Sequence, residues 1–131
     1  MDINHNKDYI GLTAGEIAEL FNTYINNSAA ICILSYFTEK TQDPDMASVI
    51  KRSLDLSTRS VNRIAEIFNS VNHPLPKGFS REDVNINAGK LYSDTFMLTY
   101  VRYMARFGLT SYCEARASCT RSDVRDFFNE F

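Results

Sequence analysis

Apolar residues recur every three or four positions over long stretches of this chain, and that spacing constrains the fold more than any other feature. The first stretch runs from Ile17 to Phe37 and the second from Ile50 to Val71, each without an internal proline or glycine. Such spacing places the apolar side chains on one face of an α-helix. Long helices of this kind bury their apolar faces against one another, so the pattern predicts an all-α bundle.

Capping signals indicate where the first two helices begin and end. Thr13 and Glu16 fit the S/T-x-x-E capping box, in which each side chain accepts a backbone N–H that the helix leaves unpaired. Asp43 and Pro44 suit the N-cap and the first helical position of the second helix. We therefore expect helices over about residues 13–41 and 44–71, with the second ending before the prolines that follow.

Gly108, in the sequence ARFGLTSY, is the main obstacle to a third long helix. The apolar spacing continues on both sides of it, and one glycine costs a helix only about 1 kcal/mol. We therefore expect a single helix over about residues 88–119. A short fourth helix is expected over 120–131, with Asp123 in the capping-box position and an apolar face made of Val124, Phe127, Phe128 and Phe131.

The segment NHPLPKGFSREDVNIN, residues 72–87, interrupts the helical pattern. Pro74 and Pro76 favour extended backbone, and fully extended the segment could span about 50 Å, the length of one helix. It can therefore cross the whole bundle and make the third helix parallel to the second. We predict a four-helix bundle with three long helices, a long crossover between the second and third helices, and a truncated fourth; if the segment does not cross, both its ends lie together and the bundle is a plain up-down one. Residues 1–12 are expected to form a tail and 13–131 a single domain.

A fourth helix this short can cover only part of the groove between the other three. An uncovered apolar groove is an interaction surface or a liability. We therefore expect a homo-oligomer, most simply a dimer, with Val124, Phe127, Phe128 and Phe131 as interface candidates. The other interpretation is that the chain is a shortened version of a longer protein.

Composition argues against several classes of function. The net charge of −2 leaves no basic footprint for nucleic acid, and no apolar run approaches the length of a membrane-spanning helix. The N-terminal sequence MDINHNKDYIGL is polar and lacks the apolar region of a signal peptide. Three cysteines without CxxC spacing favour a reduced compartment. These features predict a cytoplasmic protein that binds neither nucleic acid nor membranes.

The histidines argue against the carboxylate metal site of ferritin-like bundles. Such sites take a Glu from each of two helices and a Glu-x-x-His from each of the others. This sequence has no Glu-x-x-His, and its two histidines are His5, in the tail, and His73, in the expected crossover. We therefore expect no bound metal, no cofactor and no catalytic residues.

Polar residues nevertheless fall at core positions of the predicted helices. Asn27, Ser28 and Ser57 lie near mid-helix, where they could form a polar layer that fixes helix register or line a small ligand cavity. Asp94 falls on the core side of the third helix. It could bind a ligand, or it could lie near the helix N-terminus, where the helix dipole favours an anion. The ligand candidates are therefore Asn27, Ser57 and Asp94.

Three stretches resemble the bacterial family called domain of unknown function 3231, whose members occur in spore-formers and are often labelled spore coat proteins. They are LTAGEIAELFNTYINNSAAICILSYF, then PLP followed by KGFSREDVNINAGKLYSDTF, and GLTSYCEARASCTRSDVRDFF. The similarity runs from Leu12 onward. It implies a ferritin-like bundle with no established reaction. Because family members usually continue past the point where this chain ends, it also implies that the monomer is not self-sufficient.

Three functional hypotheses follow. The first is a non-enzymatic structural or assembly protein that associates through its apolar groove and, by the resemblance, acts in the spore coat or the mother cell. The second is a ferritin-like bundle that binds a small molecule or a metal around Asn27, Ser57 and Asp94. The third is an enzyme that uses a buried tyrosine and an aspartate.

Overall fold

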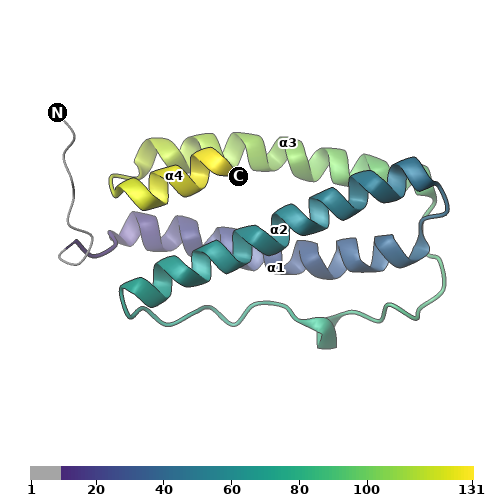
Figure 1. Ribbon diagram of the computed structural model, residues 1–131, viewed down its shortest axis with the longest axis horizontal. Helices are drawn as coiled ribbons and strands as arrows, with labels where there is room; N and C mark the ends of the chain where they lie inside the picture. Colours follow the sequence, from purple (N-terminus) through teal and green to yellow (C-terminus); the bar gives the residue numbers. More distant parts are fainter. Residues whose placement is uncertain (1–9) are drawn as a thin grey trace.

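The computed structural model describes residues 10–131, which fold into four α-helices without a strand in that range. The helices are α1 (Ala14–Lys40), α2 (Pro44–Ser70), α3 (Asp94–Ser118) and α4 (Ser122–Glu130). Figure 1 shows α1 and α2 as an antiparallel hairpin, α3 running in the same direction as α2, and α4 turning back along it. The predicted all-α bundle with three long helices and a short fourth is confirmed.

The crossover segment, residues 71–93, runs along α1 from one end of the bundle to the other (Figure 1). Its contacts advance along α1 in order. Phe79 N–H donates to Ser28 Oγ at 3.0 Å, and one turn further on Cys32 Sγ donates to the Ser80 carbonyl. Tyr36, another turn along, binds the backbone at Gly89. The crossover therefore delivers the chain to the far end of the bundle, which makes α3 parallel to α2 as expected.

Gly78 is required where the crossover segment lies closest to α1. A Cβ atom at this position would lie 2.9 Å from both Ser28 Oγ and Tyr24 Cε1. Those distances are shorter than van der Waals contact, so any side chain would push the segment away from the helix. Glycine therefore allows the hydrogen bond between Phe79 and Ser28 to form.

The third helix begins at Asp94 rather than near residue 88, which corrects the expected boundary. The residues just before Asp94 cannot join the helix, because their backbone groups bind Tyr36. The Tyr36 hydroxyl donates to the Gly89 carbonyl and accepts the N–H of Leu91. Ser93 then acts as the N-cap and accepts the N–H of Phe96 at 3.1 Å. Gly108 lies inside α3 without breaking it, as the apolar spacing indicated.

Glu16 joins the beginnings of two helices that are distant in sequence. Its Oε1 accepts the N–H of Thr13 and completes the predicted capping box of α1, while its Oε2 accepts the N–H of Arg121 at 2.9 Å. Arg121 is the N-cap of α4 and has no capping side chain of its own, so Glu16 replaces the cap expected within residues 120–123. Burial alone would raise the pKa of Glu16, but the N–H donors of Thr13 and Arg121 outweigh it and lower that pKa.

The core consists of two clusters at opposite ends of the bundle. The α4 cluster contains Leu20, Ile64, Ile67, Phe68, Ala115, Cys119, Val124, Phe127 and Phe128. The hairpin cluster, at the end where α1 joins α2, contains Ala30, Leu34, Tyr36, Phe37, Ile50, Met97 and Val101. Between the clusters lie the polar residues that the sequence placed at mid-helix.

Candidate functional site

Asn27 forms the polar layer between the two clusters. Its Nδ2 donates to the Tyr112 hydroxyl and to the Thr23 carbonyl, both at 2.9 Å, and so connects α1 to α3. Ser57 of α2 is buried close by, and both side chains line the same cavity. Ser28, in contrast, faces the crossover segment, where its hydroxyl accepts the N–H of Phe79. The structure therefore brings Asn27 and Ser57 together and assigns Ser28 to the crossover contact.

Asp94 lies away from this layer, at the first position of α3, so the expectation that it faces the core is corrected. Its Oδ2 accepts the N–H groups of Gln42 and Asp43 at 3.3 Å, and Lys90 Nζ donates to Oδ1 at 2.6 Å. The hydrogen bond from Lys90 lowers the pKa of Asp94. Asp94 thus ties the loop between α1 and α2 to the start of α3, where an anion also suits the helix N-terminus.

Two depressions open on either side of the Asn27–Tyr112 hydrogen bond. The α1–α3 groove has a volume of about 770 Å³. The α2–α3 groove, which begins at Phe131 just past the end of α4, has a volume of about 340 Å³. Both are lined by Asn27, Met104, Gly108 and Tyr112. Since Gly108 has no side chain, it leaves space in the wall that the two grooves share.

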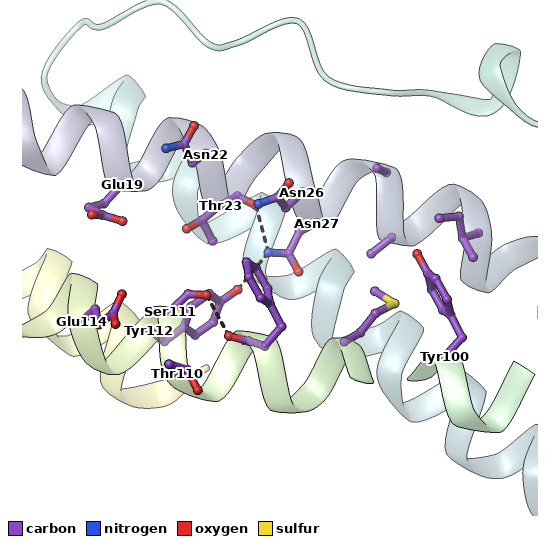
Figure 2. A pocket seen from close by; sticks show the side chains of 16 residues that line it. Glu19, Asn22, Thr23, Asn26, Asn27, Tyr100, Thr110, Ser111, Tyr112 and Glu114 are labelled. Carbon is purple, nitrogen blue, oxygen red and sulfur yellow. Dashed lines mark hydrogen bonds between the residues drawn. The ribbon is translucent and has the colours of Figure 1, made fainter. Parts of the chain in front are cut away.

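The α1–α3 groove is polar along its α1 side and carries two carboxylates. Figure 2 shows Glu19 on α1 and Glu114 on α3 at one end of the groove, with Tyr100 at the other end. Asn22 and Asn26 add amide groups, and among residues 10–131 no Lys, Arg or His lines the groove. These groups suit hydrogen bonding and attraction of positive charge, and they include no nucleophile paired with a base.

Thr23, also in this groove, was not singled out by the sequence analysis. The residue is 7 % exposed, and its side chain projects from α1 toward α3 (Figure 2). The signal for this polar wall lies in Glu19, Asn22 and Asn26, which follow helical spacing just beside the apolar positions of α1. Polar residues at that spacing are usual on a solvated helix face, so the sequence alone does not separate a groove from a surface.

The interface candidates on α4 occupy a different place from the expected one. Val124, Phe127 and Phe128 are 0 %, 1 % and 4 % exposed and pack inside the α4 cluster. Phe131 is half-buried, with the guanidinium of Arg59 5.7 Å from its ring centroid. The apolar face of α4 thus covers the chain's own core, because α4 turns back onto α2 and α3. These residues are not a free surface for another molecule.

His73 and the cysteines show no arrangement typical of a reactive site. His73 stacks on Phe68 at a centroid distance of 4.9 Å, at the start of the crossover segment, whereas His5 lies outside the described residues. Burial, followed by the charges of Glu16 and Glu19, raises the pKa of Cys119 to about 11, which keeps its thiol protonated. Within residues 10–131, no three side chains of His, Cys, Asp or Glu are grouped as metal ligands.

No helix in the described part of the chain is both long and apolar enough to cross a membrane.

Comparison with known proteins identifies the fold and the family. A crystal structure named as that of a "putative spore coat protein" from Bacillus halodurans C-125 matches with a TM-score of 0.82 and 18 % sequence identity, over 95 % of this chain and 81 % of the other. At that identity the match shows the shared fold alone. No curated protein matches the chain. A family model described as protein of unknown function, DUF3231, matches residues 2–131. The chain therefore belongs to the DUF3231 family of proteins of unknown function.

Proposed function

We propose that this protein is a non-enzymatic structural or assembly protein whose copies associate through the α2–α3 groove. The observation that carries the proposal is the apolar lining of this groove beyond the end of α4. Leu56 of α2 and Leu109 of α3 are 41 % and 71 % exposed there, beside the edge of Phe131. Apolar side chains gathered in one groove are typical of a protein interaction surface.

Two further exposed apolar residues, Val49 and Leu98, lie on α2 and α3 toward the hairpin end of the bundle. Val49 lies seven residues before Leu56, and Leu98 lies eleven before Leu109, which puts each pair on one side of its helix. A second copy related by a twofold axis would present the same patch in return, so each groove could cover the other. The interface proposed from the sequence thus moves from α4 to the facing sides of α2 and α3.

The protein of known structure supports a spore-associated role, because its name is that of a "putative spore coat protein". Coat and assembly proteins act through contacts between subunits, which is what an open apolar groove supplies. The single crossover is also the connectivity of ferritin-like bundles. We propose on this support that the protein acts in the spore coat or the mother cell.

Oligomeric mass in solution tests the proposal. Light scattering coupled to gel filtration should give a dimer or larger assembly for the unaltered chain. Leu109→Glu should reduce it to the monomer mass, because a carboxylate would enter the apolar contact. Leu109 is mostly exposed, so the fold should tolerate the change.

Phe107→Glu is the matched control. Phe107 lies two residues away on the same helix and is 69 % exposed, but it lines the α1–α3 groove instead. It should leave the mass unchanged. A monomeric unaltered chain, or equal effects of the two substitutions, would refute this interface.

A further inference from the structure

A further cavity lies between the crossover segment and the helices α1 and α3, beside the hairpin cluster and separate from the α2–α3 groove proposed for association. Its volume of about 390 Å³ lies within the range of about 300–1,000 Å³ that is usual for ligand pockets. Its walls include Phe37 of α1, Tyr92, Phe96 and Tyr100 around the start of α3, and Val84 and Ala88 of the crossover segment. We call this space the crossover cavity.

The crossover segment leaves this space because it is anchored to α1 on both sides of it. Cys32 binds the segment before the cavity, and Tyr36 binds it after the cavity. Between these anchors Asn85 accepts the N–H groups of Asn87 and Ala88, each at 3.1 Å. This span therefore makes its hydrogen bonds locally, and its turn keeps it from closing down on the helices.

The helix side of the crossover cavity is an aromatic wall. Tyr92 stacks on Phe96, with ring centroids 4.6 Å apart and planes at 16°. Phe37 meets Tyr92 and Tyr100 edge-on, at centroid distances of 6.2 Å and 5.6 Å. Aromatic rings attract one another in such stacked and edge-on arrangements beyond what their apolar area contributes. A flat aromatic molecule in the cavity would extend this series of rings, whereas an aliphatic molecule would lack these contacts.

The opening of the cavity is apolar as well. Leu91, Phe96 and Tyr92, which all line the cavity, are 69 %, 47 % and 43 % exposed. Phe37, in contrast, is almost fully buried behind them. Exposed apolar side chains gathered around a concave site are typical of ligand-binding grooves. A ligand here would cover the exposed rings and reach a buried floor.

The lining favours an uncharged ligand. Among residues 10–131, Asp83 is the one charged residue that lines the cavity, and it is exposed. Its Oδ2 already accepts the N–H of Ser80 at 2.8 Å. Moving a charge from water into an apolar space is unfavourable unless a counter-charge meets it there. An anion is disfavoured most, because the lining offers it no cation and Asp83 repels it.

We propose that the crossover cavity binds an uncharged, planar aromatic molecule, such as a fused bicyclic compound. Its rings lie against Tyr92, Phe96 and Tyr100, and its other face lies against Ala88 of the crossover segment. A hydroxyl or N–H group on its edge donates toward Asp83 at the opening.

Three probes with the same ring skeleton test the inference on the full chain. 2-Naphthol is aromatic and uncharged at pH 7, decahydro-2-naphthol is its saturated counterpart, and 2-naphthoate is aromatic but anionic. In titrations followed by the backbone amide resonances, 2-naphthol should shift the signals of residues 33–37, 83–92 and 96–100. It should bind about three- to tenfold more tightly than the saturated alcohol, because only the aromatic compound pairs with the wall. It should bind at least about tenfold more tightly than 2-naphthoate.

Equal affinities of 2-naphthol and decahydro-2-naphthol would overturn the proposal. Equal affinities of 2-naphthol and 2-naphthoate would do the same, as would shifts confined to other residues or no binding of 2-naphthol.

Substitution of one ring separates the cavity from the other aromatic residues of α3. Phe96→Leu keeps an apolar side chain but removes a ring from the wall, so it should weaken 2-naphthol binding about three- to tenfold. Tyr103→Leu is the matched control, because Tyr103 is 67 % exposed on the same helix and does not line the cavity. It should leave the affinity unchanged. Equal affinity in the two variants would overturn the site.

Filling the cavity gives a second test that removes no contact of the wall. Ala88→Leu adds side-chain atoms where the ring of the ligand lies, so it should weaken 2-naphthol binding more than about tenfold. Ala117→Leu, at an exposed position near the end of α3, is the control and should bind as the unaltered chain does. Undiminished binding in Ala88→Leu would place the probe elsewhere and overturn the site.

These outcomes are independent of the proposed association. Leu109→Glu disrupts the α2–α3 groove but should leave 2-naphthol binding unchanged, since Leu109 lines that groove and not the crossover cavity. A monomer that binds 2-naphthol would refute the association and keep the aromatic site. Loss of 2-naphthol binding in Leu109→Glu would place the probe in the α2–α3 groove and overturn the inference.

Discussion

Replacing Gly78 by alanine tests how closely the crossover segment lies against α1. The added Cβ would lie 2.9 Å from Ser28 Oγ and from Tyr24 Cε1, and 3.0 Å from Ser28 Cβ. These contacts fall on two side chains of the same helix face, so the crossover must move away from α1. Overpacking of this kind costs about 1–3 kcal/mol. Loss of the hydrogen bond from Phe79 to Ser28 adds about 1 kcal/mol. We expect Gly78→Ala to destabilise the protein by about 2–4 kcal/mol.

Gly89→Ala is the matched control, because it lies in the same segment and its Cβ would meet no atom within 4 Å. It should be neutral or stabilise by about 0.4–1 kcal/mol through the unfolded chain. For 131 residues, 1 kcal/mol corresponds to about 4 °C in Tm. Gly78→Ala should therefore lower Tm by roughly 8–16 °C in thermal unfolding followed by circular dichroism, at one fixed protein concentration. A loss of less than 2 °C, or equal effects of the two substitutions, would show that the crossover does not pack against Ser28 as described.

Two further substitutions test α3 and the Glu16 contact. Gly108→Ala should stabilise the protein by about 1 kcal/mol in urea unfolding, because alanine favours the helix and its Cβ would meet no atom within 4 Å; a loss of stability would mean that the space beside Gly108 is filled. Glu16→Gln should cost about 1–3 kcal/mol at pH 7, because the charged acceptor of the Arg121 N–H is lost. Since folding lowers the pKa of Glu16 from its ordinary 4.5, its contribution is complete above that pH and is lost as the pH falls through the folded value. Urea unfolding between pH 7 and pH 3 should therefore show a shallower acid dependence in Glu16→Gln, and identical slopes would contradict it.

The helices could be predicted from the sequence because their signals are local. The capping box at Thr13 and Glu16 and the proline at the start of α2 act within one turn of helix. The apolar spacing through Gly108 was also sufficient to predict a continuous α3. The predicted start of α3 was wrong because Tyr36, more than fifty residues earlier, binds the backbone at Gly89 and Leu91. No local pattern reports such a contact.

The candidate site was predicted only in part, for a similar reason. Asn27 and Ser57 lie together as polar mid-helix residues. The apolar face of α4 was recognised, but the sequence does not say whether the chain itself or a second copy covers Phe127 and Phe128. Asp94 shows the limit of the heptad pattern, since a position in phase with the core points at a neighbouring loop when it falls on the first turn of a helix.

The division of the core into two clusters has a consequence for how the protein opens. The α4 cluster and the hairpin cluster are separated by the layer around Asn27, where two grooves admit solvent. In the hairpin cluster, α3 contributes the buried side chains Met97 and Val101. The first half of α3 is therefore stabilised by few buried side chains, and we expect its amide hydrogens to exchange with solvent sooner than those of α1 and α2. The bundle then unfolds as two cooperative units, one for each cluster. When the hairpin unit opens first, it exposes the face of α3 that lines the two grooves.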